Sequence, residues 1–299
     1  MGELAFAAKV SHVPSIYLGE QPGHEGVHAS LREGLVRLGE AAREARVETF
    51  VVFDSHWINT IGYHVNLAAR HKGVFTSHEI PHFIHDMPYD YLGDPELAQA
   101  IVDNANAAGL STRGHDYRSM DLEYATLLPM RYMNRDRSIR VVPVGQNANT
   151  TWQENRRFGE AVRRAIEASP RRVGLLASGS MSHRFWPNEV APSRLLEVSS
   201  AFNRQTDEHV LTQWREGRWA EFLAFLPTYL EVCAGEVNMS DTVMLFGALG
   251  WDGYRGRGEQ YGDYEGSSGT GQVNVRFSVD GLGAVRAASA VAESVARRA

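Results

Sequence analysis

The sequence predicts an α/β fold: a single domain with a mostly parallel central sheet flanked by helices. Three observations support this prediction. Short runs rich in β-branched residues alternate with segments of helical periodicity, as they do in βα units. The first two of these runs lead straight into polar turns. No repeat, linker or low-complexity segment divides the 299 residues, so the simplest interpretation is one domain over residues 1–299, with the Ala-rich residues 284–299 as a peripheral tail.

The N-terminal half begins with a strand expected at residues 5–10. Apolar residues then recur at helical spacing, at Leu31, Leu35, Leu38 and Ala41, before a second strand at residues 49–53. Another helix is expected to begin at Asp94. There an acidic cap precedes Pro95 at the first helical position, and apolar residues follow at helical spacing.

The C-terminal half continues the alternation of strands and helices. The expected elements are, in order, a strand at 139–144, a helix at 154–168, a strand at 172–177, a long helix at 194–214, a buried helix at 241–249, a Gly-rich loop at 251–270 and a late strand at 272–279.

Composition excludes several classes of function. The chain is 43% apolar with a net charge of −6, which is typical of a globular protein without general affinity for nucleic acid or an anionic membrane. The single cysteine, Cys233, excludes an internal disulfide framework and a thiolate zinc cluster. Lys9 follows the first apolar run, whereas a secretory signal carries its charge before it. We therefore expect a cytoplasmic protein that acts on a small molecule.

Three histidines, His12, His56 and His183, each follow an apolar strand. Ligands of open α/β sheets bind beyond the carboxyl ends of the strands, so these side chains can converge there from distant parts of the chain. Two imidazoles and one carboxylate on one face of iron(II) leave coordination positions for substrate and oxygen. His12, His56 and one acidic residue are therefore candidate ligands.

Position alone leaves other interpretations open. The chain has 12 histidines, and many imidazoles serve only as surface or hydrogen-bonding groups. Asp54 can cap a turn, and Glu236 precedes a predicted helix, where an acid favours the helix dipole. His115 stands in a segment that reads as a surface loop. Spacing selects none of the 36 acidic residues as the third ligand.

Six motifs, in order, resemble those of the class III extradiol ring-cleaving dioxygenases of the protocatechuate 4,5-dioxygenase-like superfamily. Within that superfamily the chain looks most like the 3,4-dihydroxyphenylacetate (homoprotocatechuate) 2,3-dioxygenases. The motifs are KVSHVPS, VVFDSHW, SHEIPHFIHDMPY, LEYATLLPMRYMN, LLASGSMSHRF and GEVNMSDTVMLFGALGW. The resemblance extends over nearly the whole chain, from AAKVSHVPS to SSGTGQVN.

The resemblance implies that His12, His56 and Glu236 hold Fe(II). It also implies that His183 is the acid/base residue and that His115 lies near the substrate hydroxyls. The substrates implied for this chain are a small aromatic diol and O2, and the implied product is a muconic semialdehyde of aromatic catabolism. The resemblance also implies that the chain assembles as a homo-oligomer. No organic cofactor is needed, and GSSGTGQ lacks the spacing of a dinucleotide site.

The ring substituent of the substrate is less well defined by these motifs. A carboxylate there would need a cation or hydroxyl donors, for which the candidates are Arg184, Ser267, Ser268 and Thr270. A structural salt bridge is an equal interpretation of Arg184. Segments 143–152 and 256–266 differ from what the resemblance leads us to expect, and either is a candidate border of the pocket.

Other functions remain as alternatives. Related ortho-diols, hydroxypyridones and aminophenols are alternative substrates. Two histidines and a carboxylate would also suit a zinc or manganese hydrolase. A non-enzymatic relative of the fold is the last alternative, against which the presence of all four residues His12, His56, Glu236 and His183 counts.

Overall fold

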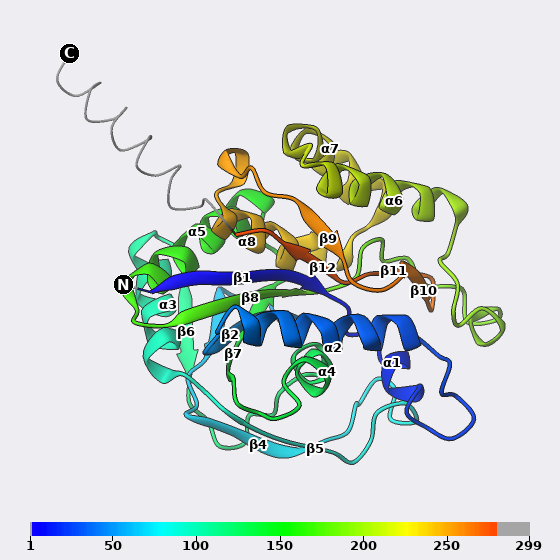
Figure 1. The fold of residues 1–299 in the computed structure, drawn as a ribbon, viewed down its shortest axis with the longest axis horizontal. Coiled ribbons are helices and arrows are strands. Elements are labelled where there is room, and N and C mark those ends of the chain that lie inside the picture. The colour runs from blue at the N-terminus through cyan, green and yellow to red at the C-terminus, as the bar shows by residue number, and fades with distance from the viewer. Residues whose placement is uncertain (1, 280–299) are drawn as a thin grey trace.

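The computed structural model describes residues 2–279, and its centre is an eight-stranded sheet (Figure 1). The strand order is β6-β3-β7-β2-β8-β1-β12-β9. The strands are β1 (Glu3–Val10), β2 (Thr49–Asn59), β3 (Tyr63–Asn66), β6 (Thr112–His115), β7 (Arg140–Asn147), β8 (Arg172–Ser178), β9 (Gly258–Gln260) and β12 (Val275–Phe277). The four central strands β7, β2, β8 and β1 pair in parallel, whereas β9 and β12 run antiparallel at one edge. The predicted α/β class is confirmed.

Helices cover both faces of this sheet (Figure 1). One face carries α2 (Ala29–Glu44) and α4 (Tyr124–Met133), and the other carries α3 (Pro95–Ala107), α5 (Trp152–Ala168) and α8 (Ser240–Leu249). The remaining elements are α1 (Ser15–Leu18), α6 (Ala201–Glu216), α7 (Trp219–Cys233), short 3-10 turns at Ala191–Ser193, Glu236–Met239 and Trp251–Gly253, and the hairpins β4 (Arg70–Phe75) with β5 (Met87–Leu92) and β10 (Glu265–Ser267) with β11 (Thr270–Gln272).

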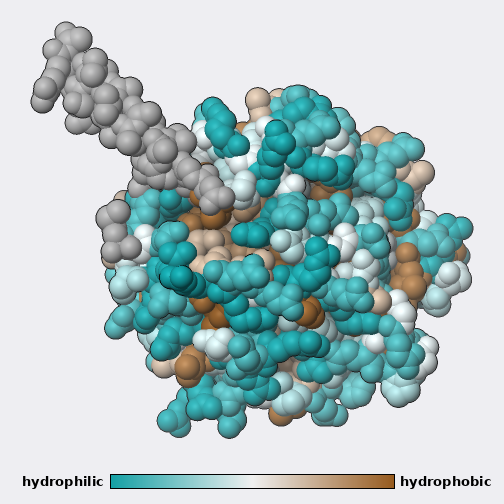
Figure 2. Space-filling model, in the orientation of Figure 1, coloured by the Kyte–Doolittle hydropathy of each residue, from teal (hydrophilic) through white to brown (hydrophobic). Residues whose placement is uncertain are grey.

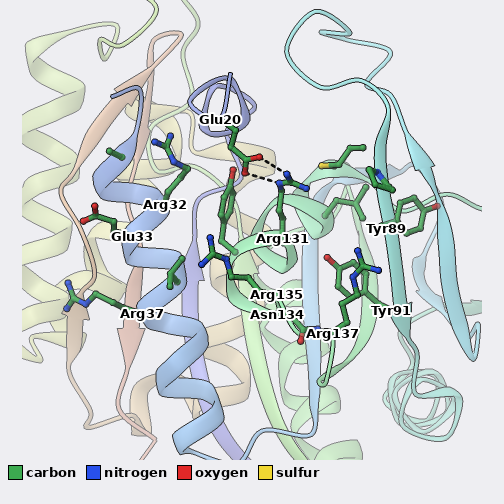
Figure 3. A pocket seen from close by; sticks show the side chains of 16 residues that line it. Glu20, Arg32, Glu33, Arg37, Tyr89, Tyr91, Arg131, Asn134, Arg135 and Arg137 are labelled. Atoms are coloured by element: carbon green, nitrogen blue, oxygen red, sulfur yellow. Dashed lines mark hydrogen bonds and ion pairs between the residues drawn. The ribbon is translucent and has the colours of Figure 1, made fainter. Parts of the chain in front are cut away.

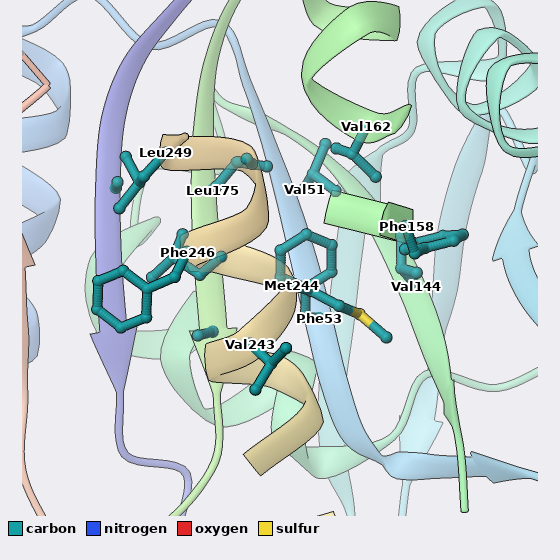
Figure 4. Packing of buried hydrophobic residues seen from close by; sticks show 14 of the residues in the cluster. Val51, Phe53, Val144, Phe158, Val162, Leu175, Val243, Met244, Phe246 and Leu249 are labelled. Atoms are coloured by element: carbon teal, nitrogen blue, oxygen red, sulfur yellow. The ribbon is translucent and has the colours of Figure 1, made fainter. Parts of the chain in front are cut away.

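Strand β2 shows why the strands read as continuous apolar runs. Val51 and Phe53 pack into the hydrophobic cluster beneath α5 and α8 (Figure 4), while Phe50 and Val52 pack into the cluster on the α2 and α4 face. Successive side chains of a strand point to opposite faces. Because both faces are covered, every position from 50 to 53 is buried, and the alternation of apolar and polar residues disappears.

The predicted start of the helix at Asp94 agrees with the cap observed. The Asp94 carboxylate accepts a hydrogen bond of 3.2 Å from the Leu97 backbone amide, and Pro95 is the first residue of α3. Helix α5 begins at Trp152, two residues before the expected start, because Thr151 and Glu154 form a reciprocal capping box.

Three predicted elements differ from the structure. The long helix at 194–214 is wrong at its start, since Ser200 caps the Asn203 amide and α6 begins at Ala201. Segment 251–270 is not only a loop, because it contains β9 and β10. The late strand at 272–279 is shorter, with β12 spanning Val275–Phe277.

The expected tail at 284–299 lies outside the described residues. The face of the molecule seen in Figure 2 is mainly hydrophilic, with smaller apolar areas between the polar side chains. Within residues 2–279, no helix has the length and apolar character needed to span a membrane.

Candidate metal centre

The candidate site lies at the carboxyl ends of three neighbouring strands, β1, β8 and β2. His12 follows β1 by two residues, and His183 follows β8 by five. His56 lies within β2, at the irregularity where its pairing with β7 shifts register between Asp54 and Ile58. The strand order places these three segments side by side although they are up to 171 residues apart in the sequence.

His12, His56 and Glu236 converge on one point. The Nε2 atoms of His12 and His56 lie 3.3 and 3.5 Å from Glu236 Oε1, respectively. One ligand atom from each of the three residues lies within 4.8 Å of the other two. The two imidazole rings stand almost perpendicular, with centroids 5.0 Å apart. Two neutral imidazole nitrogens and a carboxylate oxygen in this arrangement fit a divalent metal ion.

The hydrogen bonds around His12 define its tautomer. The Ser178 hydroxyl donates to the Ala125 carbonyl over 2.6 Å, so its oxygen accepts from His12 Nδ1 at 3.0 Å. Nδ1 therefore carries a proton, and Nε2 faces Glu236. This partner fixes the ring orientation in the way that second partners orient metal-binding histidines.

The surroundings of the second imidazole, His56, favour its neutral form. Burial lowers its pKa, and the neighbouring His12 lowers it further, outweighing the opposite effect of Glu236. A neutral ring is the form that binds a metal. The Asp54 carboxylate accepts the backbone amides of both His56 and Trp57 at 2.9 Å, so Asp54 shapes the chain that presents His56.

Glu236 comes from a strained turn between α7 and α8. The three residues after it, Val237, Asn238 and Met239, all have left-handed backbones with φ of 43°, 55° and 49°. Such a conformation costs about 1–2 kcal/mol per non-glycine residue. Strain of this kind clusters at functional sites, and here it accompanies the side chain that faces both imidazoles.

The carboxylate of Glu236 is buried and fully engaged. Burial alone would raise its pKa, but His12, with His183 and His56, outweighs burial and holds the pKa of Glu236 well below its usual range. Ser55 Oγ donates to Oε1, and the Ser180 amide donates to Oε2 at 2.6 Å. The side chain is therefore an anion whose orientation is fixed.

A cavity of about 90 Å³ opens beside these three residues, and we call it the metal cavity. It is lined by His12 and His56 and, across from them, by His183, whose Nε2 lies 3.8 Å from Glu236 Oε2. His183 is 23% exposed, so its ring is accessible from the cavity. The structure thus brings His183 to the same space as the three candidate ligands.

Tyr124 and Glu79 are among the cavity residues that were not singled out from the sequence. The Tyr124 hydroxyl lies 2.7 Å from His56 Nε2 and 2.9 Å from the Glu79 carboxylate. Burial and the charge of Glu79 raise the pKa of Tyr124, so its hydroxyl stays protonated. Both residues stand in motifs that carry the resemblance, EYATLLPM and SHEIPHF, but spacing alone marks neither.

Of the other predicted site residues, some line the metal cavity and some lie outside it. Ser267, Ser268 and Thr270 line the metal cavity. Arg184 does not, because its guanidinium turns to the Val232 carbonyl at 3.1 Å. His115 ends the edge strand β6 and hydrogen-bonds to His64 Nδ1 at 2.9 Å, and it is not part of the cavity wall.

The two segments expected to border the pocket, 143–152 and 256–266, also contribute no residue to the wall of the metal cavity. Segment 143–152 belongs largely to β7, whose side chains are buried. Segment 256–266 contains β9, an edge strand of the sheet.

A mostly parallel α/β sheet with two histidines and a carboxylate at its carboxyl edge is typical of metal-dependent enzymes that leave coordination positions open for substrate. The model of the family described as catalytic LigB subunit of aromatic ring-opening dioxygenase matches residues 6–278. The chain belongs to this family and is a ring-opening dioxygenase. The resemblance to class III extradiol dioxygenases is thereby confirmed.

Similarity to characterised relatives extends over most of the chain. It is 45% identical over 259 residues to 3,4-dihydroxyphenylacetate 2,3-dioxygenase of Escherichia coli, covering 86% of this chain and 94% of the relative. It is 24% identical over 307 residues to the 2-aminophenol 1,6-dioxygenase beta subunit of Pseudomonas sp, covering 97% and 99%. An uncharacterized protein of Escherichia coli K12 shares the fold with a TM-score of 0.62, 16% identity and coverage of 91% and 99%.

Proposed function

We propose that this chain opens the ring of 3,4-dihydroxyphenylacetate with O2, using Fe(II) held by His12, His56 and Glu236. The convergence of two imidazole Nε2 atoms on Glu236 Oε1 in a cavity also lined by His183 is the observation that carries the proposal. The substrate is inferred from the 45% identity to the Escherichia coli enzyme of that name. A set of two histidines and one carboxylate is typical of iron(II) oxygenases.

The bound metal would supply a Lewis acid that acidifies the catechol hydroxyls and would hold both reactants close together. The chain itself supplies the proton transfers. His183 Nε2 faces the cavity and, as an imidazole, can accept a proton from a catechol hydroxyl and later return one to the opened product.

The remaining groups orient the reacting atoms. The Tyr124 hydroxyl lies against His56 Nε2 and donates to Glu79, which places a protonated phenol beside the ligand set. The Ser180 amide and the Ser55 hydroxyl fix the two oxygens of Glu236. A carboxylate with both oxygens bonded keeps its geometry when substrate enters.

Anaerobic loading with Fe(II), followed by 3,4-dihydroxyphenylacetate and O2, tests this proposal. We expect a yellow ring-opened product and one O2 consumed for each substrate. Equal turnover with zinc alone, or none with any catechol under saturating iron, would show that the assigned metal chemistry is wrong. A zinc or manganese hydrolase is the outcome that such a result would favour.

A panel of substrates shows which ring substituent the enzyme prefers. Protocatechuate, gallate, 2-aminophenol and dihydroxypyridine are compared with 3,4-dihydroxyphenylacetate by kcat/KM. A preference for 2-aminophenol would indicate that the chain acts on the substrate for which the Pseudomonas relative is named.

We also propose that residues 1–299 act as one catalytic domain, since His12 and Glu236 contribute to one candidate site although they are far apart in the sequence. The resemblance further supports a homo-oligomer in the cytoplasm, which light scattering and cell fractionation would test.

A further inference from the structure

A buried carboxyl group, that of Asp207, lies behind the segment that carries His183. Asp207 belongs to helix α6, which packs against α7 and strand β11 (Figure 1). Its side chain is fully buried, and no ion pair is recorded for it among residues 2–279. A carboxyl group that is buried without a cation is costly unless hydrogen bonds satisfy its oxygens. The partners of Asp207 therefore explain why it is tolerated there.

Three side chains and one backbone amide donate to the two oxygens of Asp207. Oδ1 accepts the Tyr229 hydroxyl at 2.6 Å and lies 3.2 Å from the Ser182 amide nitrogen. Oδ2 accepts the hydroxyls of Ser182 and Tyr264 at 2.7 and 2.5 Å. Ser182 directly precedes His183 in the sequence. Asp207 thus holds both the backbone and the side chain of the residue next to the proposed acid/base group.

Both tyrosines act as donors in this cluster. Burial and the neighbouring Asp207 raise the pKa of Tyr229 and that of Tyr264, so both hydroxyls keep their hydrogens. Burial also raises the pKa of Asp207, and the hydrogen bonds from Tyr229, Tyr264 and Ser182 oppose that rise. These hydrogen bonds are what stabilises a carboxyl group in the interior.

A glycine of strand β11 leaves room for the carboxyl group. A Cβ atom at Gly271 would overlap Asp207 Oδ2. The backbone of Gly271 pairs with the same segment that Asp207 holds, since its carbonyl accepts the Met181 amide at 2.8 Å and its amide donates to the Ser182 carbonyl at 2.9 Å. Residues 181 and 182 are therefore held from two sides directly before His183.

Backbone contacts decide where the His183 ring lies. No hydrogen bond to this ring is recorded among residues 2–279, and its Nε2 atom lies 3.8 Å from Glu236 Oε2. The His183 backbone amide donates to the Cys233 carbonyl at 3.1 Å. Cys233 ends α7, one helical turn beyond Tyr229 and three residues before Glu236. Asp207 therefore contacts both segments whose side chains meet at the metal cavity.

We propose that Asp207 is a positioning residue for His183: its carboxyl group fixes Ser182 and thereby the place of the His183 ring opposite Glu236. This inference rests on the proposed function, because it concerns the residue assigned there to proton transfer. Asp207 does not line the metal cavity, so it acts on the reaction only through His183. Misplacement of a reacting group by about 1 Å can cost about 100-fold in rate, which makes such an anchor consequential.

Asp207→Asn tests the proposal with little change in shape. The Ser182 amide nitrogen lies 3.2 and 3.3 Å from the two oxygens of Asp207. In either orientation the NH2 group of the new side chain therefore faces this N–H group, and two donors cannot pair. We expect kcat for 3,4-dihydroxyphenylacetate to fall about 10- to 100-fold. Iron content and KM should stay within about twofold of the parent, because neither ligand nor substrate contacts are removed.

Asp94→Asn is the matched control. Asp94 is also a buried carboxyl group, and it accepts the Leu97 amide at 3.2 Å and the Thr49 hydroxyl at 2.8 Å. These partners begin α3 and β2 and do not line the metal cavity. We expect this variant to melt at a lower temperature than the parent and to keep its kcat.

A third variant separates positioning from stability. Asp207→Leu combined with Tyr229→Phe and Tyr264→Phe removes the carboxyl group together with two of its donors. Replacing both partners of a hydrogen bond by apolar groups of similar shape can be nearly neutral for folding. We expect the triple variant to melt closer to the parent than Asp207→Leu alone, with kcat still about 10- to 100-fold low. A kcat that returns together with stability would show that Asp207 only stabilises the fold.

A further measurement needs neither metal nor turnover. ¹⁵N NMR of the metal-free full chain, labelled at histidine, follows the His183 ring, which is assigned by the loss of its signals in His183→Phe. We expect these signals to shift or broaden in Asp207→Asn and to stay in place in Asp94→Asn. Unchanged His183 signals in Asp207→Asn would overturn the proposal.

The outcomes separate the two proposals. If the iron-loaded parent opens no catechol, the proposed function fails, and the NMR comparison still judges whether Asp207 positions His183. If the parent opens the ring and Asp207→Asn keeps its kcat within about twofold, the positioning role is wrong and the function stands. Loss of iron together with kcat in Asp207→Asn would also contradict the positioning role, because Asp207 would then support the metal ligands instead.

Discussion

Two cavities of this molecule differ in size, charge and burial. The metal cavity measures about 90 Å³. A second cavity of about 730 Å³ lies between α2, α4 and β5 (Figure 3) and is lined by five arginines, so we call it the arginine cavity. The arginines are Arg32, Arg37, Arg131, Arg135 and Arg137. Only Arg131 forms an ion pair with a carboxylate among the described residues, the contact with Glu20 drawn in Figure 3.

The difference shows that volume does not locate the chemistry. At the metal cavity, His12 and the adjacent Glu236 are 2% and 3% exposed, and His12 Nε2 lies 3.3 Å from Glu236 Oε1. In the arginine cavity, Arg37, Arg135 and Arg137 are exposed, so solvent screens their charges. Buried groups that shift one another's pKa mark a reactive site more reliably than a large opening does.

The largest effect is expected from His56→Ala. Loss of one imidazole leaves two ligands, and since removal of an outer partner of a ligand already costs about 10- to 100-fold, iron content and turnover should both fall to background. Metal analysis after iron loading measures this. Arg135→Ala, in the arginine cavity, is the control and should keep its iron. An unchanged iron content in His56→Ala would refute the ligand assignment.

A large but selective loss is expected from His183→Phe. The ring is replaced by one of similar size without a titrating nitrogen, so iron should still bind while turnover falls about 10²- to 10⁴-fold, the usual contribution of an acid/base group. Iron content and kcat are measured on the same sample. Loss of iron together with turnover would place His183 among the ligands instead.

A smaller effect is expected from Tyr124→Phe. The ring and its packing against His56 remain, and only the hydroxyl that contacts His56 and Glu79 is lost. Loss of a hydrogen bond to a charged group costs about 1.5–3 kcal/mol, so kcat should fall about 10- to 100-fold with iron retained. Wild-type kcat in this variant would show that the hydroxyl plays no part in turnover.

These effects concern residues that the sequence revealed to different degrees. Strand-end position pointed to His12, His56 and His183, because parallel strands bring their carboxyl ends together. Glu236 came only from the family motif, since the left-handed turn that aims it has no signature among 36 acidic residues. The sheet itself could be predicted, because its central strands are buried on both faces and read as apolar runs.

Contacts between distant segments could not be predicted in this way. Lys9, whose position in the sequence only argued against a secretory signal, is fully buried and pairs with Asp241 at 2.9 Å, 232 residues away. His115 has the same residue type as the three strand-end histidines, but it lies on the edge strand β6. Pairing across the fold is set by strand order, which neither periodicity nor spacing encodes.

The smallest effect is expected from Arg137→Ala, which tests the arginine cavity directly. Arg137 is exposed, and among the described residues no hydrogen bond or ion pair is recorded for its side chain. Substitutions at such positions usually change the free energy of unfolding by less than about 0.5 kcal/mol, and turnover and iron content should stay within about twofold of the wild type. Thermal melts and steady-state kinetics measure both. A kcat/KM for 3,4-dihydroxyphenylacetate that falls in Arg137→Ala, with 4-methylcatechol unaffected, would mean that the large cavity takes part in recognising the substrate's charge, and the separation of the two cavities would no longer hold.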